Sequence, residues 1–252
     1  MKPVLKHVAA SLFAALLLVL LVLLLLAGER AQRKTRLCTG LEVSLPDACA
    51  FVSEEDIARF LSRRYGDYVG LPLDSLQLGK IEALLSEKRV VLGSEAWTTD
   101  DGLLHIRIRQ RMPVLRFQRG EAGFYVDKDG VVFPLHPVYT APVPVVSGEI
   151  PPVEQGGWEP WTSAVMALMA RLDGDAQWHA WLGSVSVDSR GELLLRPAEG
   201  KEVFYFGPPD EVAEKLAKIS RYYTHIIPAK GAGYYKSIHL KFKQQVICRR
   251  DI

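Results

Sequence analysis

The chain has 252 residues, of which 48% are hydrophobic and 24% charged, and its formal net charge is +2. This composition supplies enough apolar surface for a folded core, which excludes a wholly disordered protein. The near-neutral charge excludes the strongly basic surface that nucleic-acid binding normally requires. At roughly 100–200 residues per domain, the length allows one or two folded units besides a membrane segment.

Residues 8–27 form an uncharged apolar run, VAASLFAALLLVLLVLLLLA. In a helix, about twenty residues match a hydrocarbon core roughly 30 Å thick, so the run predicts a transmembrane helix after a short tail, residues 1–7. A cleaved signal peptide is the alternative. Its apolar segment is usually about 7–15 residues long, and no small-x-small cleavage site follows Ala27. Membrane lipid is therefore an expected partner through this anchor.

Basic residues flank the apolar run on both sides. Lys2 and Lys6 precede it, whereas Arg30, Lys34 and other basic residues lie in the polar linker, residues 28–36. The positive-inside count by itself favours a cytoplasmic C-terminal part.

The next segment has the pattern of a small α+β domain. Leu41–Leu45 alternates as a strand, and Ser53–Asp56 is a capping box that begins a helix running to about Tyr65. A second helical pattern carries Leu76, Ile81, Leu84 and Leu85. Two strands, Val90–Trp97 and Leu103–Gln110, are joined by a turn containing Asp101-Gly102, which predicts a hairpin. The expected order is β-α-α-β-β.

This order resembles a POTRA domain of the FtsQ/DivIB cell-division family. The resemblance includes Phe51-Val52-Ser53, Gly102-Leu103-Leu104 and Gln110-Arg111-x-Pro113. Gly123–Leu135 is similar to the hairpin that follows the POTRA domain in the family, and Val143–Gly148 and Ile238–Val246 fit as well, most closely the branch found in Bacteroidota. The resemblance implies a POTRA domain at residues 37–112 and a β domain at residues 113–252.

The region after Pro113 predicts short strands and two helices. The expected strands are Val114–Phe117, Gly123–Asp127, Val131–Leu135, Val185–Asp188, Glu192–Arg196, Glu202–Phe206, and two near Tyr234–Phe242 and Gln244–Cys248. Trp161–Leu172 is an amphipathic helix, and a second helix begins at Pro208-Pro209-Asp210. The predicted fold class is therefore α+β: a transmembrane helix, a POTRA domain, and a mainly antiparallel β domain with two or more helices.

The sequence contains no recognisable catalytic motif, so no catalytic residue, cofactor or metal site is predicted. Cys38, Cys49 and Cys248 fit no zinc spacing, and their three possible pairings stay open. Asp127–Gly130 predicts a hairpin turn, because an EF-hand needs a Glu at its twelfth position and Val138 stands there. The six histidines are scattered, and the tryptophans Trp158, Trp161, Trp178 and Trp181 are interpreted as packing residues.

The segment Ser237–Lys243 alternates polar and apolar residues, as an edge strand does. The pattern alone allows two interpretations of its lysines: as charges that discourage aggregation, or as a basic face that receives an incoming strand. The resemblance implies the second reading, in which FtsB and FtsL, a coiled-coil pair, bind by strand addition. The residues implied as partner-binding are Tyr235, Ser237, His239, Leu240, Lys241, Phe242, Lys243 and Gln244. Phe242 lies where many family members have an aromatic residue, whereas Gln244-Gln245 replaces a glycine-containing turn.

The resemblance therefore implies a non-enzymatic scaffold of the divisome in the cell inner membrane. It would be a single-pass protein at the division septum, with a cytoplasmic N-terminus and a periplasmic C-terminal part. This orientation is the opposite of the one that the positive-inside count favours. Further partners implied are division membrane proteins similar to FtsW and FtsI. Two alternatives stay open. An outer-membrane assembly or secretion protein usually has several POTRA repeats or a barrel, and a membrane-anchored cell-wall hydrolase needs a catalytic dyad or metal set.

Overall fold

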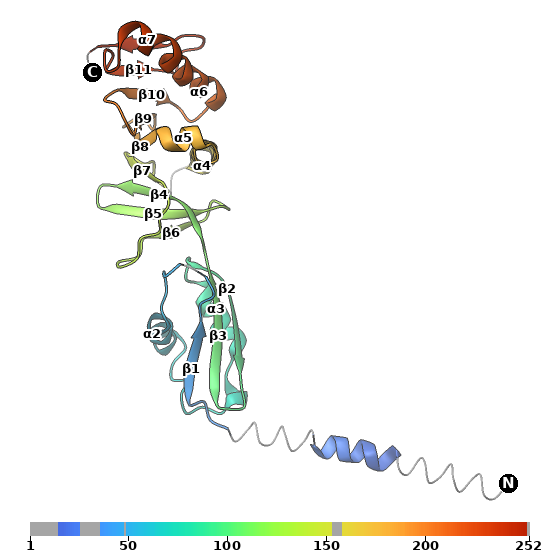
Figure 1. The fold of residues 1–252 in the computed structure, drawn as a ribbon. Helices are drawn as coiled ribbons and strands as arrows, with labels where there is room; N and C mark the ends of the chain where they lie inside the picture. Colours follow the sequence, from blue (N-terminus) through green and yellow to red (C-terminus); the bar gives the residue numbers. More distant parts are fainter. Residues whose placement is uncertain (1–14, 26–35, 48, 153–157, 251–252) are drawn as a thin grey trace, which may run out of the picture. The chain divides into compact units, whose positions relative to one another are not determined.

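The computed structural model describes residues 15–25, 36–47, 49–152 and 158–250, and the chain divides into two compact units, Met1–Gln110 and Arg111–Ile252 (Figure 1). Residues 15–25 are helical, with exposed leucine and valine side chains. Within the described ranges, no helix is both long enough and apolar enough to cross a membrane. The rest of the expected span, residues 8–14 and 26–27, lies outside the described residues, as does the linker up to residue 35.

The first unit has the predicted β-α-α-β-β order. Its elements are β1 (Gly40–Ser44), α2 (Glu54–Arg64), the 3-10 turn η1 (Leu73–Ser75), α3 (Leu78–Ser86), β2 (Val91–Thr98) and β3 (Leu103–Gln110). The sheet order is β1-β3-β2, with β1 parallel and β2 antiparallel to the central strand. The first and last strands of the unit are therefore neighbours, and the helices lie between β1 and β2 in the chain.

Local signals fix the ends of these elements. Ser53 accepts a hydrogen bond from the Asp56 amide and the Asp56 side chain accepts one from the Ser53 amide, so the predicted capping box is confirmed. In the β2–β3 hairpin, Gly102 has φ +90°, and a Cβ there would lie 3.0 Å from the Leu37 carbonyl oxygen. The buried faces of α2, α3 and β3 then share one core, which includes Ile57 and Leu61.

A buried glutamine ties the loop before α2 to the end of β3. The Gln110 side chain is 2% exposed, accepts hydrogen bonds from the amides of Phe51 (3.0 Å) and Val52 (3.2 Å), and donates to the Cys49 carbonyl (2.7 Å). One side chain thus satisfies three backbone groups that no strand or helix pairs.

The second unit is built on one sheet, which has nine strands in the described residues. They are β4 (Pro113–Arg119), β5 (Ala122–Asp127), β6 (Val132–Pro134), β7 (Val145–Gly148), β8 (Leu182–Val187), β9 (Leu193–Pro197), β10 (Val203–Gly207), β11 (Ser237–His239) and β12 (Ile247–Arg249). Their spatial order is β12-β11-β10-β9-β8-β7-β4-β5-β6, which can be followed from red to green in Figure 1. Each new strand joins the one before it, except β7, which pairs with β4 on the side opposite to β5.

Helices cover one face of this sheet. They are α4 (Trp158–Asp173), α5 (Ala176–Trp181), α6 (Val212–Arg221), the π-helical turn η2 (Tyr222–Ile226) and α7 (Ile227–Lys230). The core combines strand residues such as Phe117, Val185 and Phe204 with Leu168 from α4 and Ile219 from α6. One face of every central strand is therefore apolar and covered, as the alternating pattern predicts.

The structure also differs from the sequence-based expectations. The sheet is mixed, because β4–β7, β7–β8 and β10–β11 are parallel pairs among otherwise antiparallel ones. Strand β7 and helix α5 were not predicted. The last two strands are shorter than expected: β11 ends at His239 rather than near Phe242, and β12 begins at Ile247 rather than Gln244.

Candidate partner-binding surface at the C-terminal end of the sheet

Strand β12 is the last strand of the sheet order, and no described strand pairs with its outer side. On its inner side it is antiparallel to β11, with Ile238 opposite Cys248 and His239 opposite Ile247. Strand β11 itself lies between β10 and β12, so both of its sides are paired. The open edge in this region is therefore β12 rather than β11, and of the implied residues only Ser237 and His239 lie in β11.

The eight implied residues fall into two groups. Ser237 and Leu240 are buried, Tyr235, His239 and Lys241 are half-buried, and the exposed residues are Phe242, Lys243 and Gln244. The exposed group lies in the turn between β11 and β12. We call residues 240–246, which include this turn, the 240–246 arc. The side chains of Phe242, Lys243 and Gln244 are therefore open to solvent, whereas those of the other five are buried or half-buried.

The half-buried members have specific contacts on the open face of the sheet. The ring of His239 stacks on Tyr205 with centroids 4.5 Å apart, and Lys241 lies 3.3 Å from the Glu192 carboxylate. Burial, with the nearby charges of Arg249 and Lys241, lowers the pKa of His239, so its imidazole is neutral near pH 7. The histidine thus acts as an aromatic surface at neutral pH.

A partly apolar row crosses the open face and reaches the edge. Registered pairs place Leu194, Tyr205, His239 and Ile247 side by side on β9, β10, β11 and β12. Each of these side chains is only partly buried. A strand added beside β12 would continue this row with its own side chains, because neighbouring strands place paired residues on the same face.

Two buried lysines on α6 lie beneath this end of the sheet. Lys218 is 3% exposed and its Nζ donates to the carbonyl oxygens of Leu240 (3.0 Å) and Phe242 (2.8 Å). Lys215, 2% exposed, donates to the Pro208 carbonyl (2.8 Å). Neither lysine stands out in the sequence, where the pattern of this helix is an apolar stripe that includes Val212, Leu216 and Ile219.

Glu214 completes the contacts of Lys218. Its carboxylate lies 2.9 Å from the Lys218 ammonium and accepts a hydrogen bond from the Gln244 amide (3.3 Å). The hydrogen bond from Lys218, followed by the one from Gln244, lowers the pKa of Glu214, which keeps it ionised at neutral pH. The i,i+4 spacing of this pair was the available sequence signal, although such pairs are usually solvated.

The edge is also basic. Lys236, Arg249 and Arg250 lie in or beside β11 and β12, and the Arg250 guanidinium lies 5.8 Å from the Tyr234 ring centroid. Tyr234 and Phe242 are 41% and 42% exposed, which is high for large aromatic side chains. Exposed aromatics beside basic residues are typical of protein-binding surfaces.

Other sites considered from the sequence have structural roles. The Asp127 carboxylate accepts hydrogen bonds from the amides of Asp129 (3.0 Å) and Val131 (2.8 Å) and pairs with Arg111 (2.7 Å), as in a hairpin turn. The Trp161 indole donates to the Gly191 carbonyl, and Trp178 and Trp181 pack edge to face. In the described part of the chain, no group of three His, Cys, Asp or Glu side chains could hold a metal ion.

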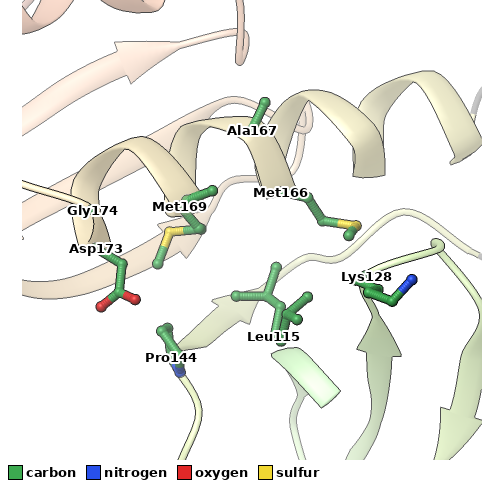
Figure 2. A pocket seen from close by; sticks show the side chains of 10 residues that line it. Leu115, Lys128, Pro144, Met166, Ala167, Met169, Asp173 and Gly174 are labelled. Atoms are coloured by element: carbon green, nitrogen blue, oxygen red, sulfur yellow. The ribbon is translucent and has the colours of Figure 1, made fainter. Parts of the chain in front are cut away.

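A cleft of about 500 Å³ lies beside α4 (Figure 2). Met166 and Met169 project from the helix toward Leu115 and Pro144, and charged residues lie at the sides. Its Lys128 is 3.0 Å from Asp129 and its Asp173 is 2.8 Å from His179, so both charges are partnered. The cleft offers apolar surface rather than a set of convergent reactive groups.

Two family descriptions match the chain. Residues 112–249 match the family "FtsQ/DivIB, C-terminal related", and residues 36–109 match "POTRA-like domain". No curated protein matches the chain. The first match covers more than half of the sequence and includes strands β11 and β12, and the second covers the β-α-α-β-β unit. The resemblance found in the sequence is thereby confirmed, and the chain belongs to the FtsQ/DivIB-related family of proteins, with a POTRA-like domain preceding the family's C-terminal domain.

Proposed function

We propose that this chain is a non-enzymatic, membrane-anchored scaffold of the bacterial division machinery. Residues 8–27 span the inner membrane, the N-terminus is cytoplasmic, and both folded units are periplasmic at the septum. The protein links early and late division proteins and helps to control septal peptidoglycan synthesis through protein contacts. Membership of the FtsQ/DivIB-related family supports this assignment.

The observation that carries the proposal is the open edge at β12. An extended segment of an FtsB/FtsL-like coiled-coil partner adds there as a further strand, since an exposed edge offers unpaired backbone groups. The neighbouring Lys236, Arg249 and Arg250 favour acidic residues in that segment. Proteins similar to FtsW and FtsI bind elsewhere on the same scaffold.

The implied residues then have two different roles. Phe242, Lys243 and Gln244 contact the partner directly from the 240–246 arc, and Phe242 supplies the aromatic anchor. The inner residues, Tyr235, Ser237, His239, Leu240 and Lys241, hold β11 in place so that β12 is presented at the edge.

Co-purification from membranes of the native host tests this proposal with two truncations. Ending the chain after Val246 removes β12 but keeps the buried Ile238 and Leu240, whereas ending it after Arg250 keeps β12. We expect a pair of small single-span proteins with heptad repeats to co-purify with the intact chain and with the Arg250 truncation. Recovery with the Val246 truncation should fall at least ten-fold.

The Arg250 truncation is the matched control, because it differs from the Val246 truncation only in β12 and Arg250. Equal recovery with both truncations would move the binding site away from β12. Absence of such a pair from the intact chain would contradict the division-scaffold assignment itself.

A further inference from the structure

Lys218 is a buried cation, so the fold must supply partners for its charge and its N–H donors. Moving an ammonium group out of water costs several kcal/mol unless its hydrogen-bonding and charge requirements are met. Lysine has three N–H donors, and Lys218 has three partners within 3.0 Å: the Leu240 carbonyl, the Phe242 carbonyl and the Glu214 carboxylate. Two of these partners belong to the 240–246 arc, 22 and 24 residues away along the chain.

In the 240–246 arc, the side chains of Lys218 and Glu214 bond the backbone, where a neighbouring strand would do so in a sheet. The Leu240 amide still donates to the Tyr205 carbonyl (3.0 Å), as a continuation of β11. Beyond that point, the two carbonyls bond to Lys218 and the Gln244 amide bonds to Glu214 (3.3 Å). The Lys218–Glu214 pair on α6 therefore holds three backbone groups of the arc just after the end of β11.

These contacts determine how the arc turns. With its carbonyl directed at Lys218, Phe242 keeps its side chain 42% exposed. Gln244 has φ +54°, a left-handed conformation that is uncommon for a residue other than glycine, and the Gln245 amide donates back to the Phe242 carbonyl. The turn then brings Ile247 opposite His239. A shift of one residue in this register would turn every side chain of β12 to the other face.

We propose that Lys218, with Glu214, is the positioning element that sets the register of the edge strand β12 and the exposure of Phe242. The effect of this element on partner binding rests on the proposed function. Its structural part, control of the 240–246 arc and β12, is independent of any partner.

Lys215 provides a matched control on the same helix. It is equally buried, but its Nζ contacts the Pro208 carbonyl (2.8 Å) and Asp210 and lies 5.0 Å from the Phe206 ring centroid. None of these contacts belongs to the arc or to β12. Lys215→Met and Lys218→Met therefore each remove one buried positive charge from α6. Only Lys218→Met releases the arc.

Hydrogen–deuterium exchange of the full chain in detergent tests the structural part. In Lys218→Met we expect the amides of residues 241–249 to exchange at least ten-fold faster, while β8, β9 and the first unit keep their rates. Lys215→Met should leave residues 241–249 unchanged. Unchanged exchange in Lys218→Met, or the same acceleration across the whole second unit in both variants, would overturn the inference.

Glu214→Leu serves if Lys218→Met does not fold, because the Glu214 side chain is 43% exposed and tolerates replacement. It removes the acceptor of the Gln244 amide and should accelerate exchange in the same residues, and unchanged exchange there would overturn the inference. Co-purification then separates the two proposals. Faster exchange with no partner on the wild-type chain contradicts only the proposed function, whereas equal partner recovery by wild type and Lys218→Met contradicts the positioning role.

Discussion

Tyr222 and Tyr223 are adjacent in the π-helical turn η2, yet their hydroxyl groups have opposite surroundings. The Tyr222 side chain is fully buried, and its hydroxyl has no hydrogen-bond partner within the described residues. The Tyr223 hydroxyl donates to the buried Glu202 carboxylate at 3.0 Å. Burial, followed by the nearby Glu202 charge, raises the pKa of Tyr222 to about 12, so this side chain is neutral over the physiological range.

The two tyrosines should respond to the same substitution with opposite signs. Tyr222→Phe removes an unsatisfied buried group and should raise the free energy of unfolding by about 1–3 kcal/mol, whereas Tyr223→Phe removes a bond to a carboxylate and should lower it by about 1.5–3 kcal/mol. Urea denaturation of the two variants measures both changes. Equal losses of stability would show that the Tyr222 hydroxyl has a partner of its own.

At the scale of elements, local patterns predicted much of the fold. The capping box at Ser53, the Asp101-Gly102 hairpin and the alternation of β3 each depend on residues close in sequence, and each was found. Strand β7 was not predicted, because its four residues follow Pro142 and Pro144 and are ordered by parallel pairing with β4 and β8.

The candidate surface was less predictable for a related reason. The alternation of Ser237–Lys243 suggested one long strand, but Lys218 bonds the carbonyls of Leu240 and Phe242. Gly207, whose φ is +80°, also approaches closely here, since a Cβ on it would lie 2.9 Å from Lys241 Cβ. No local pattern encodes contacts over such separations, so the alternation predicted an edge strand at residues 237–243, whereas the open edge lies one strand farther on, at β12.

Gln110 shows how one side chain can hold an element in place. Gln110→Leu keeps the volume but removes the acceptor of the Phe51 and Val52 amides and the donor to the Cys49 carbonyl. Since each buried unsatisfied group costs about 1–3 kcal/mol, we expect the first unit to lose at least that amount in chemical denaturation. Gln77→Leu, at an exposed position of the same unit, is the control and should change stability little.

At the scale of the whole molecule, the described residues form two separate hydrophobic cores that share no residue. Leu61 belongs to the first and Leu195 to the second, and each is fully buried. Replacing a buried leucine by alanine typically costs about 2–5 kcal/mol.

We therefore expect Leu61→Ala and Leu195→Ala to act on different unfolding transitions of the full chain. In calorimetry, each variant should lower the midpoint of one transition and leave the other within error. A single transition that both variants shift equally would mean that the two units unfold as one cooperative body.

The order of strands in the second unit has a consequence for how the protein is made. From β7 to β12 the sheet extends away from β4 in the order of synthesis, and each strand that leaves the ribosome finds its neighbour already in place. The unit can thus fold vectorially, with helices α4 and α5 made before β8 and helices α6 and α7 made before β11. A partner strand added beside β12 would be one more step of the same process, supplied by a different chain.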